Sequence, residues 1–425
     1  MPTVRTTNDA TRTIRLLLAT RFVRSIGQGA LAVDFVLYLR ALDWSPVSIS
    51  AVLSAALLGG VILTLFAGPL SDRGGRRRFL FVYEGAQFLA GLVALLSPQP
   101  AVLTAAAMVG GFGRGGNGAA GPFAPVEQAW LAQAVMPNRR GAVYSLNAAL
   151  GFLGNAIGAI GAVIPSGLHP ILPGALAYRP LFLLWSVGSL VCCGLIALTP
   201  DREATETSER RQIGPGEHGV EKRENRLVLR LMMANVLNGV GVGATGPLIA
   251  YWFAVRFGKG PAEIGPLMAG GFLMVAIASL GAGWLSRWLG MVRVVIAMRL
   301  VGLVLLIALP LAPSFAWAAS LYVLRGVFNR STTGARSALT VSIVRAHRRG
   351  FAASMANVSM QVPRSVSPVL TGFLFAANDL ALPFLIGAAF QGAYLALYYW
   401  TFHQMDADVV VGHVPVSAPD SANTA

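Results

Sequence analysis

The stretch "GPLSDRGGRRR", residues 68–78, decides the fold, because it concentrates charge in a chain that otherwise holds little. Only 12% of the 425 residues are charged, 55% are hydrophobic, and the mean hydropathy is +0.63. A soluble domain carries about 25% charged residues, so this chain lacks the side chains to coat a globule. Its apolar residues lie in blocks of about twenty, the length that crosses a hydrocarbon core of about 30 Å. We therefore predict an all-α membrane protein.

The apolar blocks predict twelve transmembrane helices in two bundles of six. Residues 200–226 separate the two sets; this stretch is charged, is poor in aromatic residues and holds Gly-Pro-Gly, so we expect a solvated linker. The predicted units are therefore residues 1–199, the linker, and residues 227–425. The expected spans are 16–39, 47–69, 79–97, 101–125, 141–164, 180–199, 227–254, 262–286, 292–311, 315–342, 351–377 and 381–402.

The basic residues predict the orientation in the membrane. If the N-terminus is cytoplasmic, twenty Lys and Arg residues lie on the cytoplasmic side and four on the other. Cytoplasmic loops carry the Lys/Arg excess in membrane proteins, so we expect both termini in the cytoplasm and the chain in the cell (inner) membrane. The net charge of +15 is thus a topology signal, and we expect the lipid bilayer, not nucleic acid, as the surrounding partner.

The two halves of the chain also resemble each other. A shift of 215 residues pairs Pro46 with Pro261 and Gly68 with Gly283, and a shift of 209 lays "NRRG" at 138–141 over "HRRG" at 347–350. Two repeats of six helices follow, and such repeats place a shared binding site at their interface near the bilayer midplane. We expect the two pseudo-symmetric bundles to act as a monomer.

The opening stretch fits the pattern G-x-x-x-D-R-x-G-R-R, which closely resembles the signature loop of the major facilitator superfamily. The matching residues are Gly68, Asp72, Arg73, Gly75, Arg76 and Arg77. A degenerate copy at 283–290 falls where that family has its second copy, with Arg287 in place of the aspartate. We expect the first copy to form a tight turn and a cytoplasmic gate that joins the two halves, with helix eleven lying beside helix two.

Two weaker resemblances suggest the subtype. "RGGNG" at 114–118 is similar to an Arg-x-x-x-Gly element of proton-linked members, in helix four. A glycine ladder in helix five resembles the motif of drug/proton antiporters but lacks its Gly-Pro pair; its members are Gly151, Gly154, Gly158 and Gly161. The resemblance implies transport by alternating access, driven by protons, with efflux favoured over uptake.

Polar side chains within the predicted spans mark the candidate site, because a charge inside a bilayer is costly unless it is paired or wetted. In helix ten they repeat on one helical face, at 325, 329, 332 and 336. In the family that this chain resembles, helices one, four, seven and ten line the cavity, and all four carry such residues here. The expected cavity residues are Gln28, Arg114, Asn117, Asn235, Asn238, Arg325, Asn329, Thr332, Gln361 and Arg364.

Two other arginines and one carboxylate have a simpler interpretation. Arg24 and Arg336 lie near the predicted cytoplasmic ends of their helices, where we expect them to extend their charge toward the membrane surface. Glu84 is expected to lie at the start of its helix, at the interface.

Proton coupling needs a group whose charge changes as the protein moves. Asp34 in helix one is the first candidate, with Arg114 as its partner, because these two cavity helices can bring the side chains together. Burial favours the protonated carboxyl and a nearby arginine favours the carboxylate. A site whose arginine moves away therefore takes up and releases a proton in step with the motion.

The predicted substrate is a small organic solute, anionic or zwitterionic, because arginines outnumber carboxylates at the middle of the membrane. An organic-anion uptake symporter is the alternative, and a receptor or scaffold without transport is a weaker one. No phosphate-binding Gly-x-x-x-x-Gly-Lys-Ser/Thr motif occurs, which argues against ATP as the energy source. The five histidines lie in loops or at span ends, so we expect no enzymatic activity, and we expect no cofactor and no metal.

Overall fold

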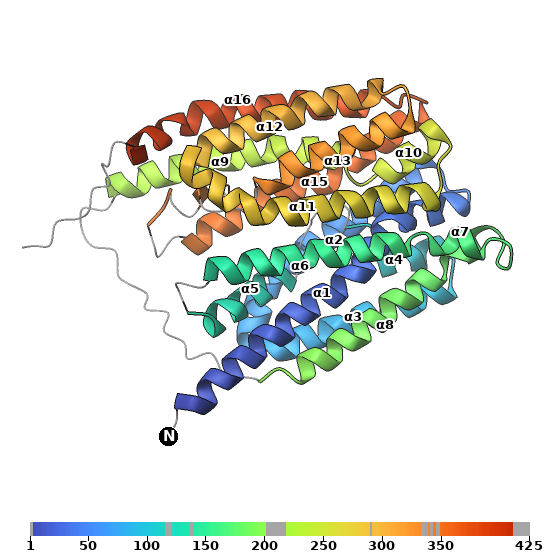
Figure 1. Ribbon diagram of the computed structural model, residues 1–425, viewed down its shortest axis with the longest axis horizontal. Coiled ribbons are helices and arrows are strands. Elements are labelled where there is room, and N and C mark those ends of the chain that lie inside the picture. The colour runs from blue at the N-terminus through green and yellow to red at the C-terminus, as the bar shows by residue number, and fades with distance from the viewer. Residues whose placement is uncertain are drawn as a thin grey trace, which may run out of the picture.

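The computed structural model describes residues 3–114, 121, 123–136, 140–200, 218–289, 291–332, 336, 339–340, 343–345 and 349–410. All regular structure in this described part is helical (Figure 1). Nine of its helices are long and apolar enough to cross a membrane, and α4 is a shorter apolar helix. The chain is thus an all-helical, multi-pass membrane protein.

The helices fall on either side of the segment 201–217, which lies outside the described residues. Those before it are α1 (Thr3–Ala41), α2 (Pro46–Gly74), α3 (Arg76–Leu96), α4 (Pro100–Gly110), α5 (Phe123–Ala134), α6 (Arg140–Gly161), α7 (Ile164–Leu168), η3 (Gly174–Tyr178) and α8 (Pro180–Ala197). Those after it are α9 (His218–Thr245), α10 (Ile249–Phe257), α11 (Pro261–Leu289), α12 (Met291–Ala308), η4 (Leu309–Leu311), α13 (Phe315–Ser331), α15 (Arg349–Ala376) and α16 (Leu382–Val410).

The helix ends follow from local sequence. Ser45 caps α2 by accepting a hydrogen bond from the Ser48 amide, and Pro46 occupies the first helical position, where no amide donor is needed. Asp379 accepts hydrogen bonds from the amides of Ala381 and Leu382 at the start of α16. Gly75, with φ of 84°, is the single residue between α2 and α3, so the predicted tight turn is present and uses a conformation that suits glycine.

Two predicted spans are interrupted, and a third ends early. The expected span 101–125 is broken after α4, because Gly111 and Gly113 adopt positive φ in a glycine-rich run that favours helix poorly. The predicted continuous helix over 101–125 is therefore wrong at residues 111–114. The span 227–254 is divided into α9 and α10, and α13 ends at Ser331, well before residue 342. The expected linker is also shorter, since α9 already begins at His218.

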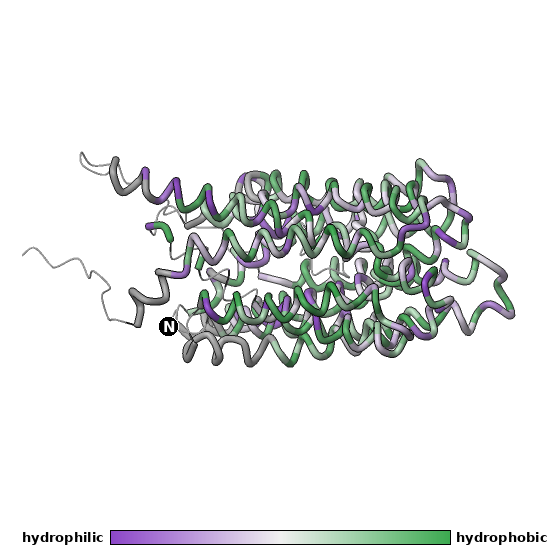
Figure 2. The backbone as a smooth tube through the Cα atoms, turned by 90° about the horizontal axis from the view of Figure 1, so that it is seen from above, coloured by the Kyte–Doolittle hydropathy of each residue, from purple (hydrophilic) through white to green (hydrophobic). Residues whose placement is uncertain are grey.

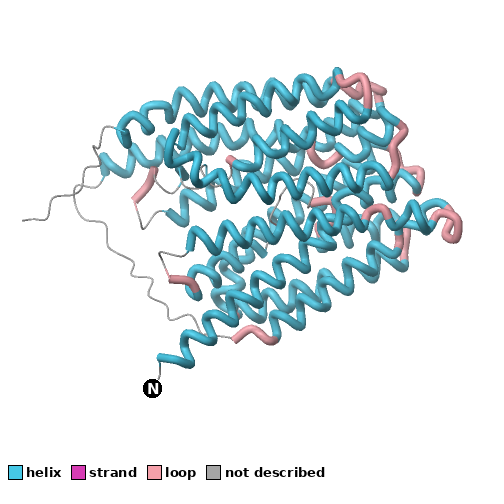
Figure 3. Tube along the Cα trace, in the orientation of Figure 1, coloured by secondary structure: helices cyan, strands magenta, loops and turns pink. Residues whose placement is uncertain are grey.

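We call the end of the molecule where α1 begins the proximal end, and the end where α1 stops and α2 starts the distal end. Most described loops lie at the distal end (Figure 3). Long hydrophobic runs follow the helices, and hydrophilic residues interrupt them at several points (Figure 2).

Packing is extensive among helices of the same half of the chain. Helix α1 packs against α6 and α8, and α3 packs against α8; in the second half, α9 packs against α15 and α16. Two long contacts join the halves, α2 with α15 and α6 with α11. The predicted pairing of helix two with helix eleven is thus observed.

The buried apolar residues show where the halves meet. At the distal end one cluster includes residues of both halves, such as Phe35 and Tyr38 of α1 with Trp252 and Phe253 of α10. At the proximal end there are separate clusters, one around Tyr83 and the other around Tyr398, each built from a single half. Within the described residues, the halves therefore share an apolar core only at the distal end.

Glycines allow the closest approaches between helices. A Cβ built on Gly265 of α11 would lie 2.7 Å from the carbonyl oxygen of Ala159 on α6. Gly372 of α15 lies against Ser50 and Pro46 of α2 in the same way. These small residues let the two halves touch at the distal end. The glycine ladder of α6 has a packing role as well, because Gly154 and Gly158 lie against the backbone of α1.

Candidate functional site

A cavity of about 170 Å³ lies within the second half of the chain. Helices α9, α11, α12, α13 and α15 supply its walls. Seventeen residues line it: Asn238, Val242, Thr245, Gly246, Met268, Gly271, Phe272, Arg299, Tyr322, Val323, Arg325, Gly326, Asn329, Arg330, Arg336, Met360 and Arg364. Five of these are arginines and none is an aspartate or glutamate, so the cavity is strongly cationic. We call it the arginine cavity.

Neutral side chains position two of these arginines. The Arg299 guanidinium donates from Nη1 to Asn238 Oδ1 at 2.8 Å and from Nε to Thr332 Oγ1 at 3.3 Å. Arg336 Nη2 donates to Asn235 Oδ1 at 2.9 Å. Both guanidinium groups also lie near the ring of one tyrosine, Tyr394, at 5.4 and 5.6 Å from its centroid. The two charges are therefore gathered around one aromatic ring.

The other cavity arginines come from α13 and α15. Arg325 Nε is buried and has no hydrogen-bond partner among the described residues. Arg330 lies 5.3 Å from the centre of the Phe272 ring, and Arg364 donates from Nη1 to Gln361 Oε1 at 3.2 Å. Of the residues predicted at 325, 329, 332 and 336, Arg325, Asn329 and Arg336 thus line the cavity, and Thr332 holds Arg299 there.

The acidic residues of the second half that the structure describes lie away from these arginines, and Glu224 near the start of α9 pairs with Arg345 at 2.9 Å. From residue 227 to residue 402 the sequence contains only Glu263 and Asp379 as acidic residues. Glu263 forms an ion pair with Lys259 at 3.1 Å, and Asp379 caps α16. Both lie at the distal helix ends, so neither neutralises the cavity.

A second, much smaller cavity lies where α2 meets α15. Its volume is about 10 Å³, and it is lined by Leu57, Gly60, Val61, Thr64, Arg114, Gly121, Gln361 and Arg364. It brings Arg114 of the first half to the same space as Gln361 and Arg364 of the second. Arg364 lines both cavities, so the two spaces adjoin.

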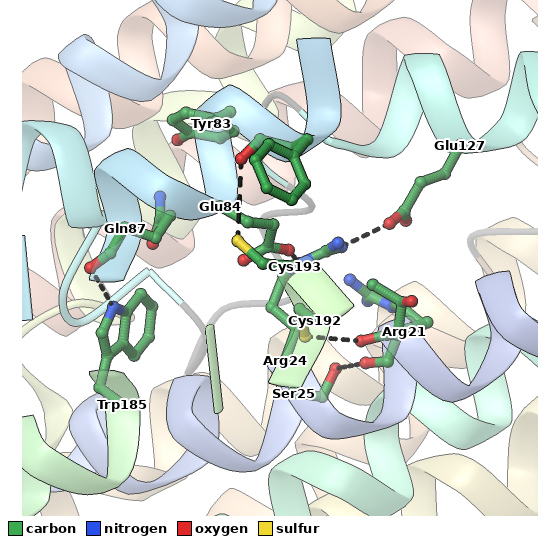
Figure 4. Close-up of polar contacts among 12 residues, drawn as sticks. Arg21, Arg24, Ser25, Tyr83, Glu84, Gln87, Glu127, Trp185, Cys192 and Cys193 are labelled. Atoms are coloured by element: carbon green, nitrogen blue, oxygen red, sulfur yellow. Dashed lines mark hydrogen bonds and ion pairs between the residues drawn. The ribbon is translucent and has the colours of Figure 1, made fainter. Parts of the chain in front are cut away.

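A buried ion-pair cluster lies in the first half, at residues that the sequence analysis left out of the site (Figure 4). Arg24 of α1 pairs with Glu84 of α3, Nε to Oε1 at 2.7 Å, and with Glu127 of α5, Nη1 to Oε1 at 2.7 Å. The Arg24 guanidinium also lies 3.6 Å from the centre of the Phe123 ring. We call Arg24, Glu84 and Glu127 the buried triad.

The buried triad corrects two predictions. Arg24 does not extend to the membrane surface; only 4% of it is exposed, because its partners on α3 and α5 hold it inside. Glu84 is not an interfacial helix-start residue; it lies two turns into α3 and is fully buried. The prediction that Arg336 extends its charge toward the membrane surface is corrected too, because Arg336 lines the arginine cavity.

The cysteines of α8 lie beside the buried triad. Cys192 and Cys193 are both free and buried. Their Sγ atoms contact backbone oxygens, of Thr20 on α1 at 3.6 Å and of Phe81 on α3 at 3.8 Å (Figure 4). They therefore help α8 pack across the two helices that carry Arg24 and Glu84.

Asp34 is fully buried in α1, and neither carboxyl oxygen has a hydrogen-bond partner among the described residues. The expected ion pair with Arg114 is therefore not formed in this structure. The glycine-rich break after α4 explains this, because it places the Arg114 guanidinium against Gly60 of α2 and Gly111 instead. Asp34 is thus a buried acid without a hydrogen bond or ion pair to its carboxyl group among the described residues.

The signature-loop arginines bind within the first half. Arg76 donates to Gln133 Oε1 of α5, and Arg77 donates to the carbonyl oxygen of Ala197 at the end of α8. Arg73 is exposed. Of the remaining predicted gate residues, the surroundings of Gly68 and the side chain of Asp72 lie outside the described part of the structure.

The remaining predicted residues divide between the two halves. Asn235 donates to the carbonyl oxygen of Ala356, and Asn238 contacts Met360 Sδ, so both also join α9 to α15. Gln28 is half-buried on α1, and Asn117 lies outside the described residues. The prediction missed Arg299 and Arg330, although an arginine inside an apolar span is itself the signal that would have identified them. In the described residues no group of three His, Cys, Asp or Glu could hold a metal ion.

Packed membrane-spanning helices that enclose polar cavities are typical of solute transporters. Comparison with known proteins points to the same class. The model of the Major Facilitator Superfamily matches residues 17–230 and 231–415, and the chain therefore belongs to that family. It is a membrane transporter of solutes.

Individual relatives and solved structures have low sequence identity to this chain. The chain is 24% identical over 413 residues to the uncharacterized membrane protein YJR124C of Saccharomyces cerevisiae, covering 89% of this chain and 92% of that one. A putative metabolite transport protein of Escherichia coli, YdjK, is 28% identical over 158 residues, which is 37% of this chain and 32% of that one.

Two solved structures share the fold. A bacterial homolog of the human lysosomal transporter Spinster, in an inward-facing and unoccupied conformation, has a TM-score of 0.70 at 14% identity, covering 94% of this chain and 98% of that one. The nucleoside transporter NupG has a TM-score of 0.68 at 13% identity, covering 92% of this chain and 99% of that one.

Proposed function

We propose that this protein is a proton-coupled secondary transporter of small organic solutes, anionic or zwitterionic, that works by alternating access. The observation that carries the proposal is the cavity lined by five arginines and no carboxylate. Its positive potential favours negatively charged solutes over the cations expected of many drug pumps. The family supplies the transport activity, and the cavity supplies the charge preference.

The proposed architecture is two six-helix bundles, residues 1–199 and 227–425, joined by the linker and acting as a monomer. The internal repeat supports it, as do the family match in two parts and the packing within each half. Both termini are proposed to lie in the cytoplasm of a cell (inner) membrane. The proximal end is then cytoplasmic, and a shared apolar core at the distal end is what an inward-open state requires.

The signature loop is proposed as a cytoplasmic gate. When the cavity opens to the distal side, the proximal ends of α2 and α15 approach each other, and Asp72 would then lie near the start of α15. A carboxylate at a helix N-terminus is stabilised by about 0.3–1 kcal/mol. The contacts of Arg76 and Arg77 within the first half are compatible with a gate that is released in the present state.

Asp34 is proposed to carry the coupled proton, with Arg114 as the group that approaches it in another state. A buried acid with no hydrogen-bond partner is most stable when protonated, so the present geometry suits the proton-loaded form. Movement of Arg114 toward it would favour release of the proton.

Asp34→Asn is expected to abolish the stimulation of transport by a pH gradient while leaving solute exchange measurable. The measurement is flux of a panel of solutes into and out of proteoliposomes, with and without an imposed gradient. Asp43→Asn is the matched control, because Asp43 is an exposed acid in the distal turn after α1 and adopts positive φ, which asparagine tolerates. Retained proton stimulation in Asp34→Asn would remove Asp34 from the coupling mechanism.

The same flux assay separates efflux from uptake. The resemblance of helices four and five to drug/proton antiporters supports efflux. The arginine cavity supports the second candidate, an organic-anion uptake symporter, because protons travelling with an anion offset its charge. In an antiporter the proton flow drives the solute in the opposite direction, whereas in a symporter the solute moves in the same direction as the protons.

A further inference from the structure

The arginine cavity holds more positive charge than a single anionic group would balance. Arg299, Arg325 and Arg336 all line it, and the partners that they have are an amide, a hydroxyl, a thioether and an aromatic ring, none of which carries a charge. The sequence places no acidic residue in this part of the membrane. The charge must therefore be balanced by something that enters the cavity.

Two of the three guanidinium groups are also held in place, which favours binding of a ligand with a defined geometry. Asn238, Thr332 and Asn235 orient Arg299 and Arg336 without consuming all their donors, since each guanidinium has five N–H groups. Arg325 contributes a buried Nε–H with no partner in the described part of the chain. Planar guanidinium forks pair with phosphate and carboxylate oxygens through two hydrogen bonds at once.

The cavity size limits the solute. Sites for drug-sized ligands have volumes of about 300–1,000 Å³, and this cavity has about 170 Å³. It therefore suits a compact solute whose anionic end fills most of the space, and it does not suit a bulky amphiphile held entirely inside.

We propose that the arginine cavity binds the doubly charged end of a compact phosphate monoester, through Arg299, Arg325 and Arg336. The inference rests on the proposed function and deepens it, because it names the substrate class. A phosphate monoester carries between one and a half and two charges near neutral pH and offers three acceptor oxygens, whereas a diester or a simple carboxylate carries one charge. The dianion balances more of the cavity charge and can pair with more than one guanidinium fork.

Binding to the purified full-length protein in detergent tests the proposal. The probes are propyl phosphate, diethyl phosphate and butyrate, measured by calorimetry at about pH 7.5. We expect propyl phosphate to bind at least about tenfold more tightly than either monoanion. Arg299→Gln and Arg336→Gln are each expected to weaken propyl phosphate by about tenfold or more and to leave butyrate less affected.

Two comparisons keep the test independent of folding. Arg299→Lys retains the charge and should recover part of the affinity, and Arg230→Gln, an exposed position on α9, should bind like the wild type. Nanodiscs containing phosphatidic acid, a lipid with the same monoester headgroup, show the source of the ligand: competition with propyl phosphate indicates a headgroup, and no competition indicates a soluble solute.

Equal affinity for the monoester and the monoanions would overturn the inference, as would wild-type binding by Arg299→Gln and Arg336→Gln. The proposed function is judged separately by proteoliposome flux. If butyrate moves in a proton-dependent way and the monoester is not preferred, the proposed transport of organic anions stands. Only the inference of a phosphate monoester as the substrate class is then rejected.

Discussion

Arg24→Gln is expected to lower the free energy of unfolding by about 3–5 kcal/mol, the range seen when one partner of a buried ion pair is removed. Glu84 and Glu127 remain buried in the variant, at 0% and 3% exposure, without the cation that neutralises them. The measurement is unfolding by denaturing detergent, followed by tryptophan fluorescence. Arg15→Gln, at an exposed position on the same helix, is the matched control and should stay within about 0.5 kcal/mol of the wild type.

A second variant identifies the cause. The triple variant Arg24→Gln, Glu84→Gln, Glu127→Gln removes every charge of the buried triad and should recover much of the lost stability. A loss below about 1 kcal/mol for Arg24→Gln would show that the buried triad does not hold α1, α3 and α5 together.

Gly265→Val is expected to reduce the initial rate of transport by about tenfold or more, because it prevents closure of the distal end. A Cβ at this position meets the Ala159 carbonyl at 2.7 Å, and a backbone atom cannot move aside as a flexible side chain can. Overpacking of this kind costs about 1–3 kcal/mol, which here falls on the distal-closed state alone. Flux in proteoliposomes measures the effect.

Gly270→Val on the same helix is the matched control, since no atom lies within 4 Å of a Cβ built there. Both substitutions place valine within α11, so they share the cost of a β-branched residue in a helix. Transport by Gly265→Val within about twofold of Gly270→Val would mean that the α6–α11 contact does not limit closure.

The membrane fold was predictable because it rests on periodic, local signals. Apolar blocks of spanning length predict the helices, and the single-residue turn at Gly75 follows from the glycines of the signature stretch. Much of the stripe at 325, 329, 332 and 336 was predictable for the same reason, because residues three and four apart share a helical face. Arg325, Asn329 and Arg336 line the cavity, and Thr332 holds Arg299 there.

The buried triad was not predictable, because its members are far apart in the sequence. Arg24 and Glu127 are brought together by the packing of α1 against α5, and no local sequence pattern around either residue predicts the other as its partner. The position of Arg114 depends in turn on the glycine break after α4, which an apolar pattern alone does not reveal. A tertiary contact decides the first case, and a local break in the helix decides the second.

The central claim is that the two halves alternate in exposing one chamber, and paired distance measurements test it most directly. Spin labels at Arg73→Cys and Ala353→Cys report the proximal ends of α2 and α15, and labels at Asp43→Cys and Leu311→Cys report the distal end; all four positions are exposed. The native cysteines are buried, so the introduced ones are the accessible targets.

Pulsed electron–electron double resonance in nanodiscs gives both distances. The samples are compared at low and high pH, with and without solute. We predict that the proximal distance shortens in the same conditions in which the distal distance lengthens, and that Asp72→Asn lowers the proximal-closed population. Two distances that stay constant, or that rise and fall together, would contradict alternating access.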